Sequence, residues 1–282
     1  MGRLLFALLI VSRVSVAAGP EADLRFRSFG VPGAFQTDIY GVNNANVVVG
    51  AWVDGNNVSH GFVAGAGKIK TIDDPNGSST YCMAINNLNV IVGYYTTPQL
   101  ASQAFVYANG KFTDIGPDGA EGSRALGIND LGEINGMSVD SNSVARGFLW
   151  NGSQYISIDV PGAIATLGGG INNAGILTES WIDLERNSEA SVYDGKKFVT
   201  VNEPGAMNTW AGAINNENEM VLYWQDTDRN YHGTLLRGKT FYEFNDPLGA
   251  QTFGHGVNDH HVIVGSYRPP GDHGNFGFAT KF

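Results

Sequence analysis

The sequence predicts an all-β protein, a six-bladed β-propeller built from four-stranded antiparallel blades. Three observations predict it: an asparagine recurs every 43 residues, each interval holds four short strand-like runs, and no run has a helical period. A unit of this size is typical of a propeller blade. It must pack against its neighbours, because a lone blade leaves both sheet faces in water. The repeated residues are Asn43, Asn86, Asn129, Asn172, Asn215 and Asn258.

The second copy shows the four predicted strands, named a to d from the axis outwards. Strand a covers Tyr81–Asn86, strand b Val90–Thr96, strand c Gln103–Ala108 and strand d Lys111–Ile115. The runs are rich in β-branched and aromatic residues. Asn109-Gly110 between strands c and d suits a type I′ hairpin turn. The recurring asparagine falls at the a–b turn, where we expect its side chain to bond the turn backbone.

The two ends of the chain predict how the ring closes. The chain begins with a spare d strand, Leu24–Phe29, and finishes after a c strand, Phe276–Phe282. Joining the two completes the sixth blade and removes the open sheet edges. The alternative, an open solenoid, would leave both end faces uncapped. We therefore expect residues 19–282 to form a single propeller domain.

The first residues have the pattern of a secretory signal. Met1–Ala18 contains an early arginine, the apolar run Leu4–Val11 and small residues at its end, although Arg13 interrupts the approach to the cleavage site. The apolar run is too short to span a bilayer. We therefore predict a secreted or periplasmic protein without a transmembrane segment.

The composition narrows the class of partner. Removing residues 1–18 takes away two of the 17 basic residues and none of the 27 acidic ones, so 15 − 27 leaves a net charge of −12. This charge argues against nucleic acid and anionic membranes as partners. Cys82 is the only cysteine, so no intrachain disulfide is possible, and we expect it to be buried and unreactive.

The units resemble the bacterial extracellular HAF-repeat family. The resemblance rests on His60-Gly61-Phe62 in strand c, on the run Ile128-Asn129-Asp130-Leu131-Gly132, and on the run Asp159-Val160-Pro161-Gly162-Ala163. It covers essentially the whole mature chain. It implies a propeller-like fold and an exported protein, and it implies no particular activity.

An antiparallel meander sends alternate loops to opposite ends of a blade, so the d–a and b–c loops share one face of the disc. Acidic residues outnumber arginines on that face. This predicts a surface for a cationic ligand, a metal ion or a basic partner; alternatively, aspartate is there only because it makes good turns. Asp226–Asn230 partly matches a calcium loop. The acidic residues are Asp54, Asp73, Asp74, Asp118, Glu121, Asp140, Asp159, Asp183, Glu185, Glu189, Asp226, Asp228, Asp246 and Asp272.

Candidate ligand-binding residues lie where the copies disagree, at the start of strand a. This strand is innermost, so its first side chains should surround the channel mouth on the acidic face. Aromatic rings with an aspartate, an arginine and a histidine suit a sugar or another small ligand. The alternative is packing between blades. The predicted site residues are Asp38, Tyr40, Tyr81, Arg124, Trp210, Phe253 and His255.

Catalysis has little support in the sequence. There is no Gly-x-Ser-x-Gly, His-Glu-x-x-His or phosphate-loop motif. Asp183 with Glu185 is an unspecific acid pair, and His260-His261 beside Asp259 is either a ligand cluster or a solvated turn. We therefore predict a binding or interaction module with no cofactor and no metal. An exported, carbohydrate-active hydrolase or lyase on the same face and a structural envelope or matrix protein remain the alternatives.

Overall fold

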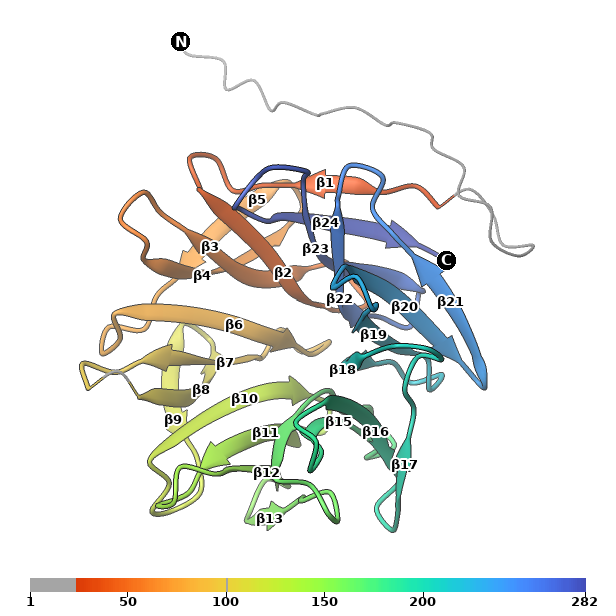
Figure 1. The fold of residues 1–282 in the computed structure, drawn as a ribbon. Helices are drawn as coiled ribbons and strands as arrows, with labels where there is room; N and C mark the ends of the chain where they lie inside the picture. The colour runs from red at the N-terminus through yellow and green to blue at the C-terminus, as the bar shows by residue number, and fades with distance from the viewer. Residues whose placement is uncertain (1–23, 100) are drawn as a thin grey trace.

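The computed structural model describes residues 24–282 apart from residue 100. These residues form six four-stranded antiparallel sheets arranged in a ring (Figure 1). The predicted six-bladed propeller is confirmed. The predicted signal at 1–18 lies outside the described residues.

Blades one to five each use four consecutive strands, which follow one another from the axis outwards. Blade one comprises β2 (Gln36–Val42), β3 (Val48–Val53), β4 (Ser59–Gly65) and β5 (Lys68–Ile72). Blade two comprises β6 (Ser79–Ile85), β7 (Ile91–Thr96), β8 (Ser102–Ala108) and β9 (Lys111–Ile115). Blade three comprises β10 (Gly122–Ile128), β11 (Ile134–Val139), β12 (Ala145–Trp150) and β13 (Tyr155–Ser157). Blade four comprises β14 (Ala165–Gly168), β15 (Leu177–Ile182), β16 (Ser188–Tyr193) and β17 (Phe198–Thr200). Blade five comprises β18 (Asn208–Ile214), β19 (Met220–Gln225), β20 (Tyr231–Arg237) and β21 (Thr240–Phe244).

Blade six joins the two ends of the chain. It consists of β22 (Gln251–Val257), β23 (Val262–Arg268), β24 (Phe276–Lys281) and, outermost, β1 (Arg27–Phe29). In Figure 1 the red N-terminal strand lies beside the blue C-terminal strands. Ser28 pairs with Phe278 in antiparallel register. The predicted closure is confirmed, with a strand that starts later than the predicted Leu24.

One cross-strand pair between strands b and c recurs in the core of every blade. In four blades a glycine of strand b faces a phenylalanine of strand c that is at most 2% exposed, as in Gly50 with Phe62. In blades four and five the sizes are exchanged, and the pairs are Glu179 with Ser191 and Leu222 with Thr234. The large side chain has moved from strand c to strand b, so the pair keeps filling the core. This exchange explains why copies four and five have Glu179 and Leu222 where the other four copies have a glycine, seven residues after the recurring asparagine.

The repeated asparagines link all six blades around the axis. The Oδ1 atom of Asn43 accepts hydrogen bonds from the backbone N–H groups of Ala45 and Val47, as expected for its turn. Its Nδ2 group donates to the backbone carbonyl of Asn86 in the next blade, at 3.2 Å. The same donation recurs from every blade to the next and closes on itself.

A second ring of bonds follows at the next residue. The backbone N–H of Asn44 donates to the Oδ1 atom of Asn87 at 2.8 Å, and this contact also recurs around all six blades. In two blades the residue is Asp130 or Asp259 instead of asparagine. We call these two circuits the asparagine rings. They fasten the a–b end of the propeller, because every bond in them crosses from one blade to its neighbour.

Candidate functional site

Side-chain contacts show which loops share a face. His60 lies 3.7 Å from Asp54 of a b–c turn and 2.8 Å from Asp73 of a d–a loop. At the other end, Arg237 beside a c–d hairpin lies 2.5 Å from Glu219 of an a–b turn. In these two blades a b–c turn therefore lies beside a d–a loop, and a c–d hairpin lies beside an a–b turn.

A cavity of about 360 Å³ lies on the axis and is lined by all six innermost strands. We call it the axial cavity. Tyr40, Trp210 and His255 of the predicted site line it. Within the described part of the chain, no lysine, arginine, aspartate or glutamate does so. Its other side chains are mainly apolar or small, with Met83, Leu126 and Leu167 opposite the aromatic side.

An aromatic cluster forms one wall of the axial cavity. Trp210 stacks on Tyr223 with ring centroids 5.0 Å apart and planes 12° apart. The His255 ring stands edge-on to Tyr223 at 5.7 Å and to Tyr40 at 5.2 Å. Phe253 packs behind the wall, 5.8 Å from Tyr223. These rings come from three consecutive blades, five, six and one, so ring closure brings them together.

Two other predicted residues lie beside the cavity without lining it. Tyr81 stacks on Tyr94 at 4.7 Å, and the Arg124 guanidinium lies 4.6 Å from the centre of the Tyr94 ring. The Nε atom of Arg124 also donates to the Oγ atom of Ser102 at 3.0 Å. Arg124 is thus held between a ring face and a hydroxyl.

Asp38 has a role different from the predicted one. Its Oδ2 atom accepts a hydrogen bond from Gln36 at 2.5 Å, and its Oδ1 atom accepts one from Asn275 at 2.8 Å. Because Asn275 belongs to blade six, the carboxylate joins the first blade to the last. The carboxylate does not line the cavity.

The groups in the aromatic wall are uncharged at neutral pH. Burial lowers the pKa of His255 to about 4, against an opposing effect of Asp38. Burial also raises the pKa of Tyr223, and burial together with Asp38 raises that of Tyr40. The Nε2 atom of His255 lies 3.3 Å from the Oγ atom of Ser266. The wall therefore offers ring faces, hydroxyls and a neutral imidazole to a ligand.

Sequence reasoning missed the contribution of strand b. Tyr223 and Ser180 line the cavity, and Tyr94 stacks on Tyr81. These residues occupy one repeated position, which pairs in register with the row of predicted residues, as Trp210 pairs with Tyr223. The copies disagree at this position as well, so the criterion applied to strand a would have found it.

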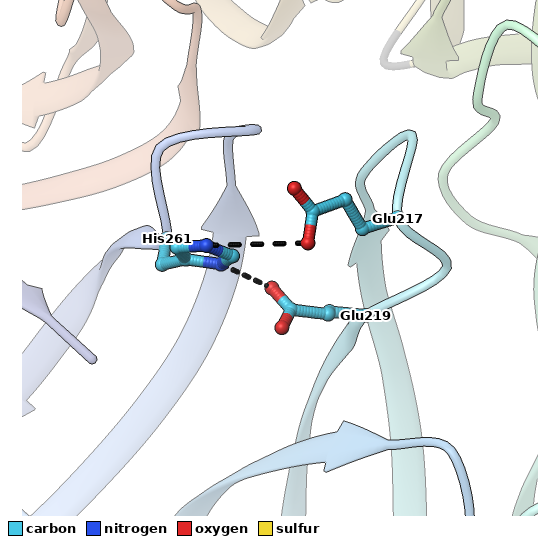
Figure 2. Close-up of side chains that lie close together, drawn as sticks. All are labelled: Glu217, Glu219 and His261. Carbon is cyan, nitrogen blue, oxygen red and sulfur yellow. Dashed lines mark hydrogen bonds and ion pairs between the residues drawn. The ribbon is translucent and has the colours of Figure 1, made fainter.

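Glu217, Glu219 and His261 are the one group of three His, Cys, Asp or Glu residues close enough to hold a metal ion among the described residues (Figure 2). The Nδ1 atom of His261 lies 2.8 Å from Glu219, and its Nε2 atom lies 4.0 Å from Glu217. Both Glu219 oxygens are already bonded, because Arg237 and Asn215 contact it as well. Burial alone would raise the pKa of Glu219, but these hydrogen bonds lower it below its usual value. The cluster is a hydrogen-bonded network in which His261 of blade six contacts the two glutamates of blade five.

The cluster contains neither His260 nor Asp259, which the ligand-cluster alternative grouped with His261. Instead, Asp259 takes part in the second asparagine ring, where its Oδ1 atom accepts a hydrogen bond from the backbone N–H of Asn216. Its Oδ2 atom also accepts hydrogen bonds from the side-chain amides of Asn44 and Asn216. His261 turns towards the glutamates of the preceding blade.

Two other acidic candidates accept hydrogen bonds from the backbone of the turns in which they lie. The Oδ1 atom of Asp226 accepts hydrogen bonds from the backbone N–H groups of Asp228 and Asn230, so this carboxylate closes a b–c turn. Asp183 accepts the corresponding bond from Asn187. This arrangement supports the turn interpretation of both residues over the calcium and acid-pair alternatives.

Cys82 is fully buried, and burial raises the pKa of its thiol. The prediction of a buried cysteine is confirmed. The raised pKa keeps the group as a thiol, which is the poorly nucleophilic form.

Comparisons with solved structures show the fold and no more. No protein-family model matches the chain, and neither does any curated protein. The chain is similar to the lectin SapL1, solved in complex with alpha methyl fucoside, with a TM-score of 0.60 and 12% identity over 87% of this chain and 93% of that one. It is also similar to the six-bladed Aleuria aurantia lectin, with a TM-score of 0.51 and 14% identity over 84% and 90%. TolB from Acinetobacter baumannii matches with a TM-score of 0.60 and 11% identity over 89% and 65%.

These likenesses and the sheet order define the chain as a six-bladed β-propeller. Within residues 24–282 apart from residue 100, no helix has the length and apolar character needed to cross a bilayer.

Proposed function

We propose that the protein is a binding module that takes an uncharged sugar into the axial cavity. The observation that carries this proposal is the stack of Trp210 on Tyr223 in the cavity wall. Sugars present C–H faces that pack on aromatic rings and hydroxyls that exchange hydrogen bonds with tyrosine, serine and imidazole groups. The volume of about 360 Å³ lies at the lower end of the range for small-ligand sites.

The charge distribution supports a neutral ligand. A charged sugar would lose its hydration in the cavity and find no opposite charge in the lining. The lectins of similar fold, one of them solved with a fucoside, support carbohydrate as the ligand class at the level of analogy.

A glycan array probed with wild-type protein and with Trp210→Ala tests this function. We expect the variant to lose binding to neutral glycans at least tenfold, because the stacking surface is gone. Phe35→Ala is the matched control, since Phe35 is an aromatic residue 57% exposed in the loop before β2 and outside the cavity. Wild-type protein that binds no glycan, or Trp210→Ala that binds like wild type, contradicts the proposal.

A second candidate function is docking of a basic partner on the acidic loops. Four b–c turns present an aspartate at the same repeated position, namely Asp54, Asp140, Asp183 and Asp226. Hydrogen bonds within these turns contribute to lowering the pKa of each, so all four are charged at neutral pH. Binding of a polylysine probe that weakens steeply with salt would support this function, and binding indifferent to salt would contradict it.

Export is part of the same proposal. The signal pattern at residues 1–18 and the resemblance to HAF repeats support a secreted or periplasmic module. Cell fractionation of the full chain, with N-terminal sequencing of the product, tests it. Full-length protein retained in the cytoplasm contradicts export.

A further inference from the structure

We propose that the axial cavity receives the end of a sugar chain and excludes internal residues of the chain, an inference that rests on the sugar-binding function proposed above. The shape of the channel beyond the aromatic wall supports this inference. A cavity that is open at both ends lets a sugar chain pass through, whereas a cavity that is closed at one end admits only the end of a chain.

The channel narrows where the innermost strands carry very small residues. A Cβ atom placed on Gly41 would lie 3.0 Å from the Cα atom of Ala84, and one placed on Gly170 would lie 2.8 Å from that of Ala213. A Cβ atom on Gly256 would lie 3.3 Å from the Cα atom of Gly41, across the junction of the last blade with the first. Neighbouring strands therefore touch backbone to backbone. We call this level the waist; its residues are Gly41, Ala84, Gly127, Gly170, Ala213 and Gly256.

These contacts limit the width of the waist. Adding a Cα–Cβ bond of about 1.5 Å puts neighbouring Cα atoms at most about 4.5 to 5 Å apart. Four of the six steps around the waist have this limit. If the repeat gives the other two the same length, the ring measures roughly 9 to 10 Å between opposite Cα atoms, and the atomic radii leave an opening of about 5 to 6 Å. A sugar ring with its hydroxyl groups does not fit through this opening.

The waist cannot widen without breaking bonds between blades. The asparagine rings begin two residues further along the strands, and each of their twelve contacts joins neighbouring blades at 2.8 to 3.2 Å. The space they surround is only about 70 Å³. The a–b end therefore offers no exit for a sugar, and the ligand must enter and leave through the opposite mouth.

Trp210 and Tyr223 lie on the mouth side of the waist, inside the cavity. An internal sugar carries a further residue on both sides, and the waist blocks one of them. Only a terminal residue can stack on the pair with the remainder of the chain leaving through the mouth.

The test compares two presentations of the same sugar to wild-type protein, so misfolding cannot account for a difference. The probes are array glycans in which each neutral monosaccharide occurs once at the non-reducing end and once capped by another residue. Hits are then measured by titration calorimetry, with the methyl glycoside of the terminal sugar as the smallest probe. We expect capping to weaken binding at least tenfold and the methyl glycoside to retain binding.

Two failures are distinguishable. If capped and terminal glycans bind within threefold of each other while Trp210→Ala still abolishes both, terminal recognition is wrong and the sugar-binding function stands. If wild-type protein binds no neutral glycan in either presentation, the sugar-binding function is wrong, and this inference with it.

Discussion

The side-chain amide of Asn258 donates a hydrogen bond at 2.9 Å to the backbone carbonyl of Asn43, which precedes it by 215 residues. This contact closes the first asparagine ring between blade six and blade one. The pairing of β1 with β24 closes the propeller at its outer edge, because it adds the N-terminal strand to blade six. The two ends of the chain are thus held together both at the axis and at the rim.

Asn258→Ala should lower the free energy of unfolding by about 2 kcal/mol, because it removes a buried bond between blades and leaves turn N–H groups without their acceptor. Urea denaturation measures the loss. Asn56→Ala is the control, since its side chain is exposed on a b–c turn, and it should change stability by less than about 0.5 kcal/mol. Equal losses in the two variants would contradict a special role for the ring.

The exchanged pair in blade four should show strong coupling. Glu179→Gly removes a large buried side chain, and Ser191→Phe forces a large one into a filled core, so each destabilises the protein. The double variant recreates the glycine–phenylalanine pair of the other blades. We expect it to be more stable than the sum of the single effects by at least about 1 kcal/mol. A double-mutant cycle measured by urea denaturation tests this coupling. Single effects that add up within error would contradict the exchange of sizes.

His232 should stabilise the protein more in mildly acidic than in alkaline solution. Its Nδ1 atom lies 3.2 Å from Glu243 and its Nε2 atom 3.1 Å from Asp226, and these carboxylates raise its pKa above 6.5. The stabilisation is complete below the unfolded pKa of 6.5 and is lost as pH rises through the raised value. His232→Gln should therefore lose most stability near pH 6 and least near pH 9. A loss that does not vary between these pH values is the contrary result.

The contribution of His255 to stability should depend on pH with the opposite sign. Burial lowers its pKa to about 4, so the unfolded chain binds a proton that the folded protein rejects between pH 6.5 and 4. Stability should fall as pH decreases through this window, and His255→Gln should lack that part of the fall. Thermal unfolding of both proteins at pH 4, 5, 6 and 7 measures the difference. Parallel curves would show that His255 is not buried as a neutral ring.

Much of the fold could be predicted from the sequence, because the repeat carries it. The period of Asn43 and its counterparts set the number of blades, and the spare strand before Gln36 indicated closure. The exchange of Glu179 with Ser191 could not be seen, because it requires the register between two strands. Along the chain alone, Glu179 and Ser191 are two unrelated departures from the repeat.

Part of the lining of the candidate site could be predicted from the sequence, and the physical reason differs between residues. Tyr40 lines the cavity and Asp38 does not, although they are two positions apart on one strand. A bulge between Ile39 and Gly41 interrupts the simple alternation of that strand. The partner of Asp38, Asn275, is 237 residues away, so no local pattern indicated it.

The size exchange in blades four and five lies wholly within single sheets, whereas every axial bond spans two. A mutation inside a sheet can be compensated by a second mutation in the same blade. A change in the asparagine rings involves both neighbouring blades at once. A gained or lost blade would alter the curvature that allows the last blade to bond to the first. Such a protein can vary the residues inside its blades while the residues of the asparagine rings stay constant.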